Sequence, residues 1–476
     1  MSKNRLLSVA FEGCCHSELD KIYSAVAKLK APLDLLIIGG DFQAVRNHSD
    51  LNCMSVPRKY LQLGDFADYY SGRKTAPILT VFIGGNHEAS NYLWELYYGG
   101  WVAKNIYYLG AAGVIDVGGV RIAGLSGIFN RPHYFHGHHE RMPYSGSDVR
   151  SAYHIRQFEV LKLYQLTGKV EIALSHDWPA GIEHHGDLAQ LLRVKKHFKS
   201  DITNKALGSP PAMSLLKKLK PKHWFSAHLH VKYPAIIEHK NSHQTKKQKL
   251  DSFESEVLDT GSRSIQKDTL AIVSQAEVAT TNEPNEKLHE ESGIISVDHD
   301  KPQGKEEEDQ EKENAKREGH QKELHDQDDE GYAHTRFLAL DKCLPRRKFL
   351  QAFTIPSNLK RKQHAILRYD PEWLAITKAM EPFMSLEADE RPLFNTPEGK
   401  VELSRLIAAA KVWVNENIVA ERKLDVPLNF QITAPVTKPN DNMSLLSVQP
   451  KEYENNQTQD FCNLLEIPNR IYFGKN

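Results

Sequence analysis

The amino-acid sequence predicts an α/β protein in which layers of sheet are flanked by helices. Apolar runs of strand length recur along the first 240 residues, and most are separated by helix-compatible segments. Polar residues of the kinds that bind metals follow these runs directly, at the position where function collects in open α/β sheets. Together these observations favour one layered α/β domain over residues 1–242, with its chemistry at the strand ends.

The expected strands are short apolar runs that fit buried positions in a sheet. They span residues 6–11, 33–40 (LDLLIIGG), 78–85 (ILTVFIGG), 120–126, 171–176 (EIALSH) and 223–228 (HWFSAH). Segments 19–30 and 150–166 are compatible with helices between them. This alternation of strand and helix is typical of layered α/β domains.

Composition separates a central segment from the rest of the chain. The chain has 476 residues, 40% hydrophobic and 26% charged, enough for one large or two ordinary domains. Residues 298–330 contain 14 acidic and 6 basic residues, a net charge of −8, with Ala315 and Leu324 as the only aliphatic side chains. Such a segment cannot bury a core. We therefore expect a long disordered acidic linker over residues 243–331.

Beyond the linker, residues 332–476 are expected to form a returning strand and a small, mainly helical C-terminal module. The strand is FLALDK at 337–342, which would rejoin the first domain. YDPEWLAITKAMEPF at 369–383 indicates helical structure, and a further helix is expected around 399–420. Apolar residues follow helical spacing there, at Leu403, Leu406, Ile407, Ala410 and Val414.

The sequence favours neither a membrane protein nor a disulfide-rich protein. No stretch approaches the roughly 20 apolar residues of a membrane span, and the N-terminus lacks the layout of a signal peptide. We therefore expect a soluble intracellular protein without a membrane partner. The five cysteines are odd in number and scattered, and a CxxC pair is absent, so reduced thiols are expected.

A basic run lies at residues 190–222, with nine Lys or Arg residues against one acid, Asp201. A solvated face is the ordinary interpretation of a charge run. Because this run lies between candidate metal ligands, a surface that faces RNA or phosphate is an equal alternative.

Five strand ends carry residues that can bind metal ions. FEGCCH gives Cys14, Cys15 and His16; GGDF gives Asp41; GGNHE gives Asn86 and His87; SHDWP gives His176; SAHLHVKYP gives His228 and His230. Each signal alone is weak, because a lone histidine at a strand end is more often a core or surface residue. The cysteines by themselves could belong to a redox site or to half of a zinc finger. Jointly, the set predicts a dinuclear metal centre.

The residue types match the chemistry of such a centre. Two divalent ions about 3.5–4 Å apart need a shared carboxylate, neutral donors and open positions for water and phosphate oxygens. Asp41 fits the bridge. Terminal ligands come from the imidazoles of His16, His176, His228 and His230 and from the Asn86 amide oxygen. His87 is adjacent to a ligand but is not needed as one, and it fits a proton donor.

The series of candidate ligand motifs GD, GNH, H and HxH resembles that of the calcineurin-like metallophosphoesterases. This family folds as a sandwich of sheets flanked by helices. The motifs are more closely similar to the lariat debranching enzymes. They include GCCHSELDKIY, GGDFQAVRN, GGNHEASNYLWEL, GLSGIF, LSHDWP, LGSPPA, WFSAHLHVKYPA and TRFLALDKCLPRRKFLQ. The resemblance covers residues 5–240 and resumes at the last of these motifs. It is specific, because most metallophosphoesterases have Asp where this chain has Cys14.

The resemblance implies how two metal ions are held. One would be bound by Cys14, His16, Asp41 and His230, and the other by Asp41, Asn86, His176 and His228. His87 matches the family's catalytic histidine, expected to protonate the leaving 2′ oxygen. A thiolate ligand is softer than a carboxylate, so Fe²⁺ and Zn²⁺ are expected, with Mn²⁺ as a substitute. The Cys15 side chain is expected to point away into the sheet.

Substrate choice is expected to come from residues 128–157, which the resemblance identifies as the lariat-recognition loop. The segment combines basic and aromatic side chains that can pair with phosphates and stack on bases. The candidates for substrate contact are Arg131, Tyr134, Arg141, Tyr144, Arg150 and Arg156.

The function implied by the resemblance is hydrolysis of the 2′-5′ phosphodiester branch of excised intron lariats, which opens them to linear RNA for turnover. Lariat RNA would be the substrate and the nucleus the location, with shuttling to the cytoplasm as an option. Spliceosome-associated or RNA-turnover proteins would contact the acidic linker or the C-terminal region. Two alternatives stay open: a metallophosphoesterase acting on ordinary RNA, DNA or phosphoproteins, and a non-catalytic RNA-binding scaffold with the same fold.

Overall fold

The computed structural model describes residues 4–29, 32–239, 331–389, 393–394, 396–437 and 448–472. The expected acidic linker over 243–331 lies outside these residues, apart from Gly331. Within the described part of the chain, no helix has the length and apolar character needed to cross a membrane.

The first sheet has six strands in the order β12-β1-β2-β3-β5-β4. Its centre is parallel and consists of β1 (Leu6–Glu12), β2 (Leu35–Ile38), β3 (Thr80–Phe82) and β5 (Ile106–Tyr108). The edge strands β4 (Gly100–Ala103) and β12 (Leu350–Pro356) pair antiparallel. Glu12 lies opposite Ile38, and Ile38 lies opposite Phe82, so β1, β2 and β3 end at the same level. The residues that follow these strands therefore meet at one edge.

The second sheet has seven strands in the order β10-β11-β9-β8-β7-β6-β13. The parallel strands are β7 (Val120–Leu125), β8 (Ile172–Ser175), β9 (His223–Ser226) and β11 (His334–Ala339). The antiparallel strands are β6 (Ala112–Val117), β10 (Tyr233–Glu238) and β13 (Leu367–Tyr369). Because β11 and β13 follow the 240–330 segment in sequence, the C-terminal region completes this sheet.

The two sheets pack face to face through alternating side chains. Leu7, Val9 and Phe11 of β1 share one buried core with Ile172 and Leu174 of β8. The intervening residue, Ala10, belongs to a second core formed with α1 (Leu19–Ala27), α2 (Phe66–Tyr70) and α3 (Ser90–Glu95). Both faces of β1 are therefore covered, which explains its continuous apolar sequence.

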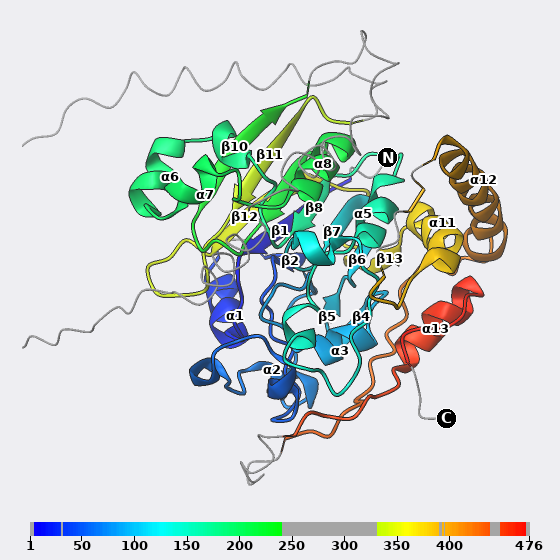
Figure 1. Ribbon diagram of the computed structural model, residues 1–476, viewed down its shortest axis with the longest axis horizontal. Helices are drawn as coiled ribbons and strands as arrows, with labels where there is room; N and C mark the ends of the chain where they lie inside the picture. Colours follow the sequence, from blue (N-terminus) through cyan, green and yellow to red (C-terminus); the bar gives the residue numbers. More distant parts are fainter. Residues whose placement is uncertain are drawn as a thin grey trace, which may run out of the picture. The chain divides into compact units, whose positions relative to one another are not determined.

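Helices flank the sandwich on its outer sides (Figure 1). α5 (Gln157–Tyr164) packs on β6 and β7, with α8 (Pro210–Leu219) beside it. At one side lie α6 (Leu188–Val194) and α7 (Phe198–Thr203), and at the other lie α11 (Pro371–Met380), α12 (Pro397–Val414) and α13 (Asn456–Leu465). The short α4 (Arg131–Tyr134) lies in the 128–157 loop.

The predicted fold class is confirmed as two mixed sheets flanked by helices, with a helical C-terminal region. The expected helix at 150–166 is shorter, because Ile128 forms a β-bridge with His154 and keeps that segment in the loop. The expected 399–420 helix is α12, which continues as a π-helical turn at Asn415–Val419. Strands β4, β5, β6, β10, β12 and β13 were not among the predicted elements.

Candidate metal centre

The candidate ligands follow the C-terminal ends of parallel strands in both sheets. Cys14 and His16 follow β1, Asp41 follows β2, Asn86 follows β3, His176 follows β8, and His228 and His230 follow β9. Backbone hydrogen bonds join these loops: His16 N donates to the Asp41 carbonyl at 2.7 Å, and Ala227 N donates to the His176 carbonyl at 3.1 Å. The topology of two parallel sheet centres thus brings distant parts of the sequence to one place.

Cys14, His16, Asp41 and His230 form a compact cluster. Their candidate ligand atoms all lie within 4.8 Å of one another. His16 Nε2 is 3.2 Å from His230 Nε2 and 3.7 Å from Asp41 Oδ2. A thiol, a carboxylate and two imidazoles at this spacing can converge on one divalent cation. It is the only cluster of this kind among the residues that the structure describes.

Asp41 also reaches a second group, formed with Asn86, His176 and His228. His176 Nε2 is 3.3 Å from Asp41 Oδ1, and the His176 and His228 ring centroids are 5.1 Å apart. Asn86 Oδ1 and His176 Nε2 are buried without a hydrogen-bond partner. Since an unsatisfied buried polar atom costs about 1–3 kcal/mol, a cation between these atoms would stabilise the site. The residues present therefore fit two divalent ions, with one Asp41 oxygen directed toward each group.

The ionisation of these groups also suits cation binding. Burial lowers the pKa of His16 to about 4, of His228 to about 3 and of His230 to about 2, so these imidazoles are neutral near pH 7. Burial opposes ionisation of Asp41, but the imidazoles of His176 and His87 bring its pKa well below the ordinary value. For Cys14, burial and the Asp41 carboxylate raise the pKa of the thiol, so a thiolate there requires a neighbouring cation.

The ligand loops adopt backbone conformations that are rare outside glycine. His16, Asp41, His228 and His230 have φ values of 45°, 47°, 58° and 49°, all in the left-handed region. Conformations of this kind cost roughly 1–3 kcal/mol each and persist only where the surrounding structure enforces them. Their concentration around one point indicates that the fold holds these side chains for function.

Glu88 holds two of the ligand loops, and sequence reasoning gave it no role. Its carboxylate accepts hydrogen bonds from the backbone N–H groups of Phe42, Gln43 and Gly85, each at 2.8 Å. The side chain is buried, and burial together with the Asp41 carboxylate raises its pKa to about 7. The only signal in the sequence was its position directly after GGNH.

His87 stands beside Asn86 with its ring fixed from one side. Its backbone N–H donates to Asp41 Oδ1 at 3.0 Å, and its Nδ1 lies 3.1 Å from the Ser55 carbonyl oxygen. A carbonyl accepts only from a protonated nitrogen, so Nδ1 carries a proton, and Nε2 lies 3.2 Å from the Asn86 Nδ2 amide nitrogen. The His87 and His16 ring centroids are 5.8 Å apart, which places His87 within the site.

Cys15 faces away from the ligands, as expected. It is buried in the core on the helix side of the first sheet, with Leu19, Ile22 and Phe42. All five cysteines are buried free thiols. Adjacent cysteines therefore have separate environments, one at the cluster and one in the core.

The substrate-contact candidates of the 128–157 loop divide into two groups. Arg131 and Arg150 are exposed. Tyr134, Tyr144 and Arg156 are buried, and Arg156 forms an ion pair with Glu140 at 2.5 Å. Arg141 donates to the carbonyl oxygens of His138, Glu140 and Leu386. The side chains of the second group thus make internal contacts that shape the loop, and only Arg131 and Arg150 present an exposed cation.

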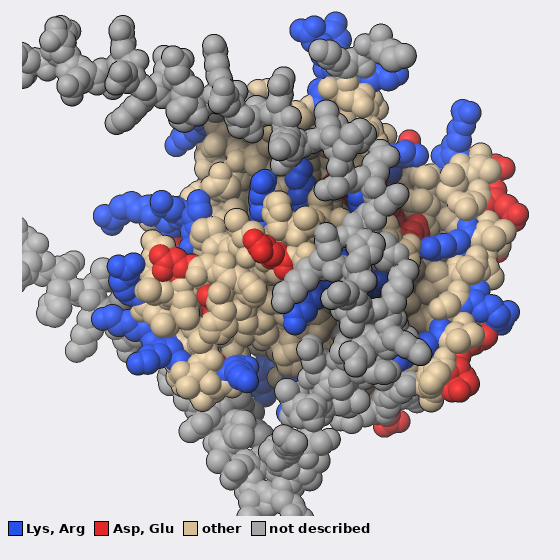
Figure 2. Space-filling view, turned by 90° about the horizontal axis from the view of Figure 1, so that it is seen from above, with Lys and Arg blue, Asp and Glu red and all other residues tan. Residues whose placement is uncertain are grey.

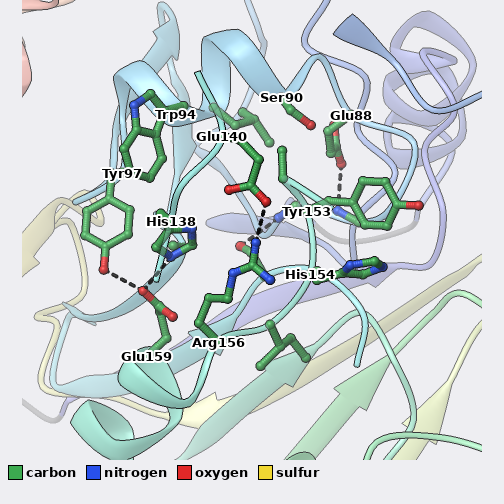
Figure 3. Close-up of a pocket in the computed structure, with 18 of the residues that line it drawn as sticks. Glu88, Ser90, Trp94, Tyr97, His138, Glu140, Tyr153, His154, Arg156 and Glu159 are labelled. Carbon is green, nitrogen blue, oxygen red and sulfur yellow. Dashed lines mark hydrogen bonds and ion pairs between the residues drawn. The ribbon is translucent and has the colours of Figure 1, made fainter. Parts of the chain in front are cut away.

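Residues of the loop line a cavity, and the loop is held from the C-terminal region. In Figure 3 the Arg156–Glu140 pair lies beside a second cluster, in which Glu159 accepts from Tyr97 and contacts His138. The loop backbone donates twice to residues beyond the 240–330 segment: Gly137 N to Glu387 O at 2.9 Å, and His138 N to Ser385 O at 3.0 Å. The C-terminal region therefore determines the position of this loop.

Comparison with known proteins gives two family matches. Residues 7–232 match the calcineurin-like phosphoesterases, and residues 332–470 match the C-terminal domain of lariat debranching enzymes. A lariat debranching enzyme of Schizosaccharomyces pombe is 43% identical over 475 residues, covering 98% of this chain and 96% of that protein. Those of Drosophila melanogaster and Homo sapiens are 40% and 39% identical, covering 97% of this chain and 78% and 69% of the relatives.

Gly85 provides a test of the metal centre. A Cβ at this position would meet Asp41 Oδ1 and would lie 2.7 Å from His176 Nε2, whereas a Cβ at Gly146 would meet nothing within 4 Å. Gly85→Ala should therefore weaken metal affinity by about 10–100-fold, as expected for a disturbed ligand geometry, while Gly146→Ala should retain the parent's metal content. Elemental analysis of the purified proteins measures this. Equal metal content in both variants would show that the Asp41 and His176 side chains do not form the site.

Proposed function

The chain belongs to the lariat debranching enzymes, and from this premise we propose that it hydrolyses the 2′-5′ phosphodiester branch of excised intron lariats. The reaction opens the lariat to linear RNA. The observation that carries this function is similarity over nearly the whole chain to debranching enzymes, together with a cluster of candidate metal ligands that includes Cys14. The family matches at 7–232 and 332–470 support a catalytic domain over 1–242 and a debranching-enzyme module over 332–476.

We propose that the first metal ion is held by Cys14, His16, Asp41 and His230, and the second by Asp41, Asn86, His176 and His228. Bound divalent ions supply Lewis-acid stabilisation of the phosphate and lower the pKa of a water molecule. The soft Cys14 donor favours Fe²⁺ or Zn²⁺ over hard cations, with Mn²⁺ as a substitute. Glu88 keeps the Asp41 and Asn86 loops at a fixed separation through its three backbone hydrogen bonds.

His87 is proposed to donate a proton to the leaving 2′ oxygen. The Ser55 carbonyl accepts from Nδ1 and so orients the ring, and Nε2, which lies 3.2 Å from Asn86 Nδ2, would hold the transferred proton. Asp41 accepts from the His87 backbone N–H, which ties the position of the acid to the bridging carboxylate. The leaving group is thereby neutralised as the bond to phosphorus breaks.

The 128–157 loop is proposed to recognise the branched RNA. Arg131 and Arg150 are exposed and suited to phosphates, while Tyr134, Arg141, Tyr144 and Arg156 support the loop from within. We propose the nucleus as the location, because the proposed substrates are excised introns. A phosphodiesterase for ordinary RNA is the alternative, and the match of residues 332–470 to the debranching-enzyme module argues against it.

A comparison of isomeric substrates tests the proposed function. The purified protein should cleave a 2′,5′-linked dinucleotide and should leave its 3′,5′ isomer essentially intact. Product formation followed by chromatography measures both rates under one set of conditions. Comparable rates for the two isomers would favour the broader phosphodiesterase.

His87→Ala should lower turnover of a branched RNA by roughly 10²–10⁴-fold, the usual contribution of a general acid. Metal content and RNA affinity should stay close to the parent, because the proposed role is proton transfer. His184→Ala is a matched control, since this side chain is 57% exposed and lies outside the cluster. Turnover of His87→Ala at the parent level would remove His87 from the mechanism.

Cys14→Asp should move metal preference toward Mn²⁺ and away from Fe²⁺ and Zn²⁺, because a hard carboxylate replaces a soft thiolate without changing the number of ligands. It should also reduce inactivation by mild peroxide, since the thiolate is the most oxidisable donor. Elemental analysis after incubation with mixed metals gives a readout apart from activity. Cys15→Ser is the neighbouring control and should change neither property; the opposite pattern would reverse the assignment of the two cysteines.

A further inference from the structure

A basic loop borders the metal centre on the side of the first metal group. This loop, residues 342–348 (KCLPRRK), lies in the connection between β11 and β12, directly after Asp341, and contains Lys342, Arg346, Arg347 and Lys348. Because β11 runs parallel to β9, the loop begins at the same sheet edge as the ligand loops. A β-bridge pairs Lys342 with Cys14, and Cys343 N donates to the Cys14 carbonyl at 3.2 Å.

The positive charge of the 342–348 loop is only partly neutralised. Arg347 pairs with Asp341 at 3.3 Å. Across the described ranges, no ion pair links the side chains of Lys342, Arg346 or Lys348 to a carboxylate. Arg346 and Lys348 are exposed. Lys342 is close to the site: burial is the main cause of the low pKa values of His16 and His230, and the charge of Lys342 lowers both further.

The longer basic run at 190–222 is divided by the fold. Its first part, on α6 and α7, follows His176 in the sequence. These helices lie at the left of Figure 1, and the left side of Figure 2 carries several Lys and Arg side chains. Its second part, including Lys217 and Lys218, lies on or after α8 and precedes β9. That part is at the N-terminal end of the sheet, opposite the ligand loops. An RNA-facing surface near the metal centre therefore cannot include the Lys217 and Lys218 side.

The position of the proposed acid indicates on which side of the metal centre the leaving group lies. His87, the proposed acid, lies beside Asn86, and its neighbour Ser55 contacts Tyr153 of the 128–157 loop at 3.4 Å. The branchpoint nucleotide, which carries the leaving 2′ oxygen, therefore belongs on that side. The nucleotide whose 5′ phosphate is attacked must extend elsewhere. The 342–348 loop lies beside Cys14, His16 and His230. Its basic side chains are therefore available to the nucleotide that bears the attacked phosphate.

On the basis of the proposed function, we propose that the 342–348 loop binds phosphates of the RNA arm that is attached through the 2′-5′ bond. Lys and Arg bind such phosphates without reading sequence, which suits an enzyme that must accept many introns. The excess of basic residues over the single acid of this connection, Asp341, and its position next to a phosphodiester site favour RNA over a protein partner. The 128–157 loop would then hold the branchpoint, and the 342–348 loop the arm that bears the attacked phosphate.

Branched RNAs with 2′ arms of different length test this proposal in the full-length protein. With Arg346→Gln and Lys348→Gln combined, the Kd for an RNA with a 2′ arm of about eight nucleotides should rise about ten-fold at moderate salt, as expected for two lost phosphate contacts. The Kd for an RNA with a single nucleotide on that arm should rise by less than about two-fold, since it offers no distal phosphates. Fluorescence anisotropy in the His87→Ala background measures binding without turnover.

The matched control is Lys217→Gln combined with Lys218→Gln, which removes the same charge from an exposed surface of α8. It should leave the Kd of both RNAs at the parent value. The proposal is overturned if the Arg346 and Lys348 variant weakens both RNAs equally, if the effect follows the length of the 3′ arm, or if no RNA is affected. These outcomes are separate from failure of the proposed function, which would appear as cleavage of 3′,5′ bonds by the parent protein.

Discussion

The shared carboxylate of Asp41 is the constraint on which the site depends. One oxygen lies 3.7 Å from His16 and the other 3.3 Å from His176, so the two ligand groups can act together only if this side chain is held between them. The surrounding structure holds it through a left-handed backbone at Asp41 and a glycine at Gly85, where a side chain would overlap the carboxylate. The unfavourable backbone is maintained because the loops around it are tied to two packed sheets.

The ligand side chains of the metal centre lie close together but make few hydrogen bonds with one another. Among the imidazoles, the buried carboxylate and the buried thiol, Asn86 Oδ1 and His176 Nε2 make no hydrogen bond, an arrangement that is unfavourable unless cations are present. Glu88 accepts hydrogen bonds from three backbone N–H groups and so holds the Asp41 and Asn86 loops at a fixed separation. It does not occupy a ligand position itself. Binding of metal and correct positioning of the loops are therefore coupled.

The C-terminal region is part of the catalytic structure as well as a covering module. It contributes β11 and β13 to one sheet and β12 to the other, and it fixes the 128–157 loop through Ser385 and Glu387. Arg46, in the loop after Asp41, is buried and binds Asp50, Glu95 and Thr433, so the same region also reaches the metal side of the first sheet. The position of the substrate loop and the shape of the metal centre therefore depend on residues far away in the sequence.

The sequence alone determined which residues could bind metal, because strand-length apolar runs ending in Cys, His, Asp and Asn are a local pattern. It also identified β1, β2, β3, β7, β8 and β9, which are mostly buried apolar runs, and β11, which alternates between exposed and buried residues. Only the tertiary structure decided which of the basic and aromatic candidates are exposed, since burial of Tyr134, Tyr144 and Arg156 depends on long-range packing. The tertiary structure also decided the roles of Glu88 and Lys342. Their roles follow from neighbours brought together by strand order, and strand order is a long-range property that residue spacing along the chain does not contain.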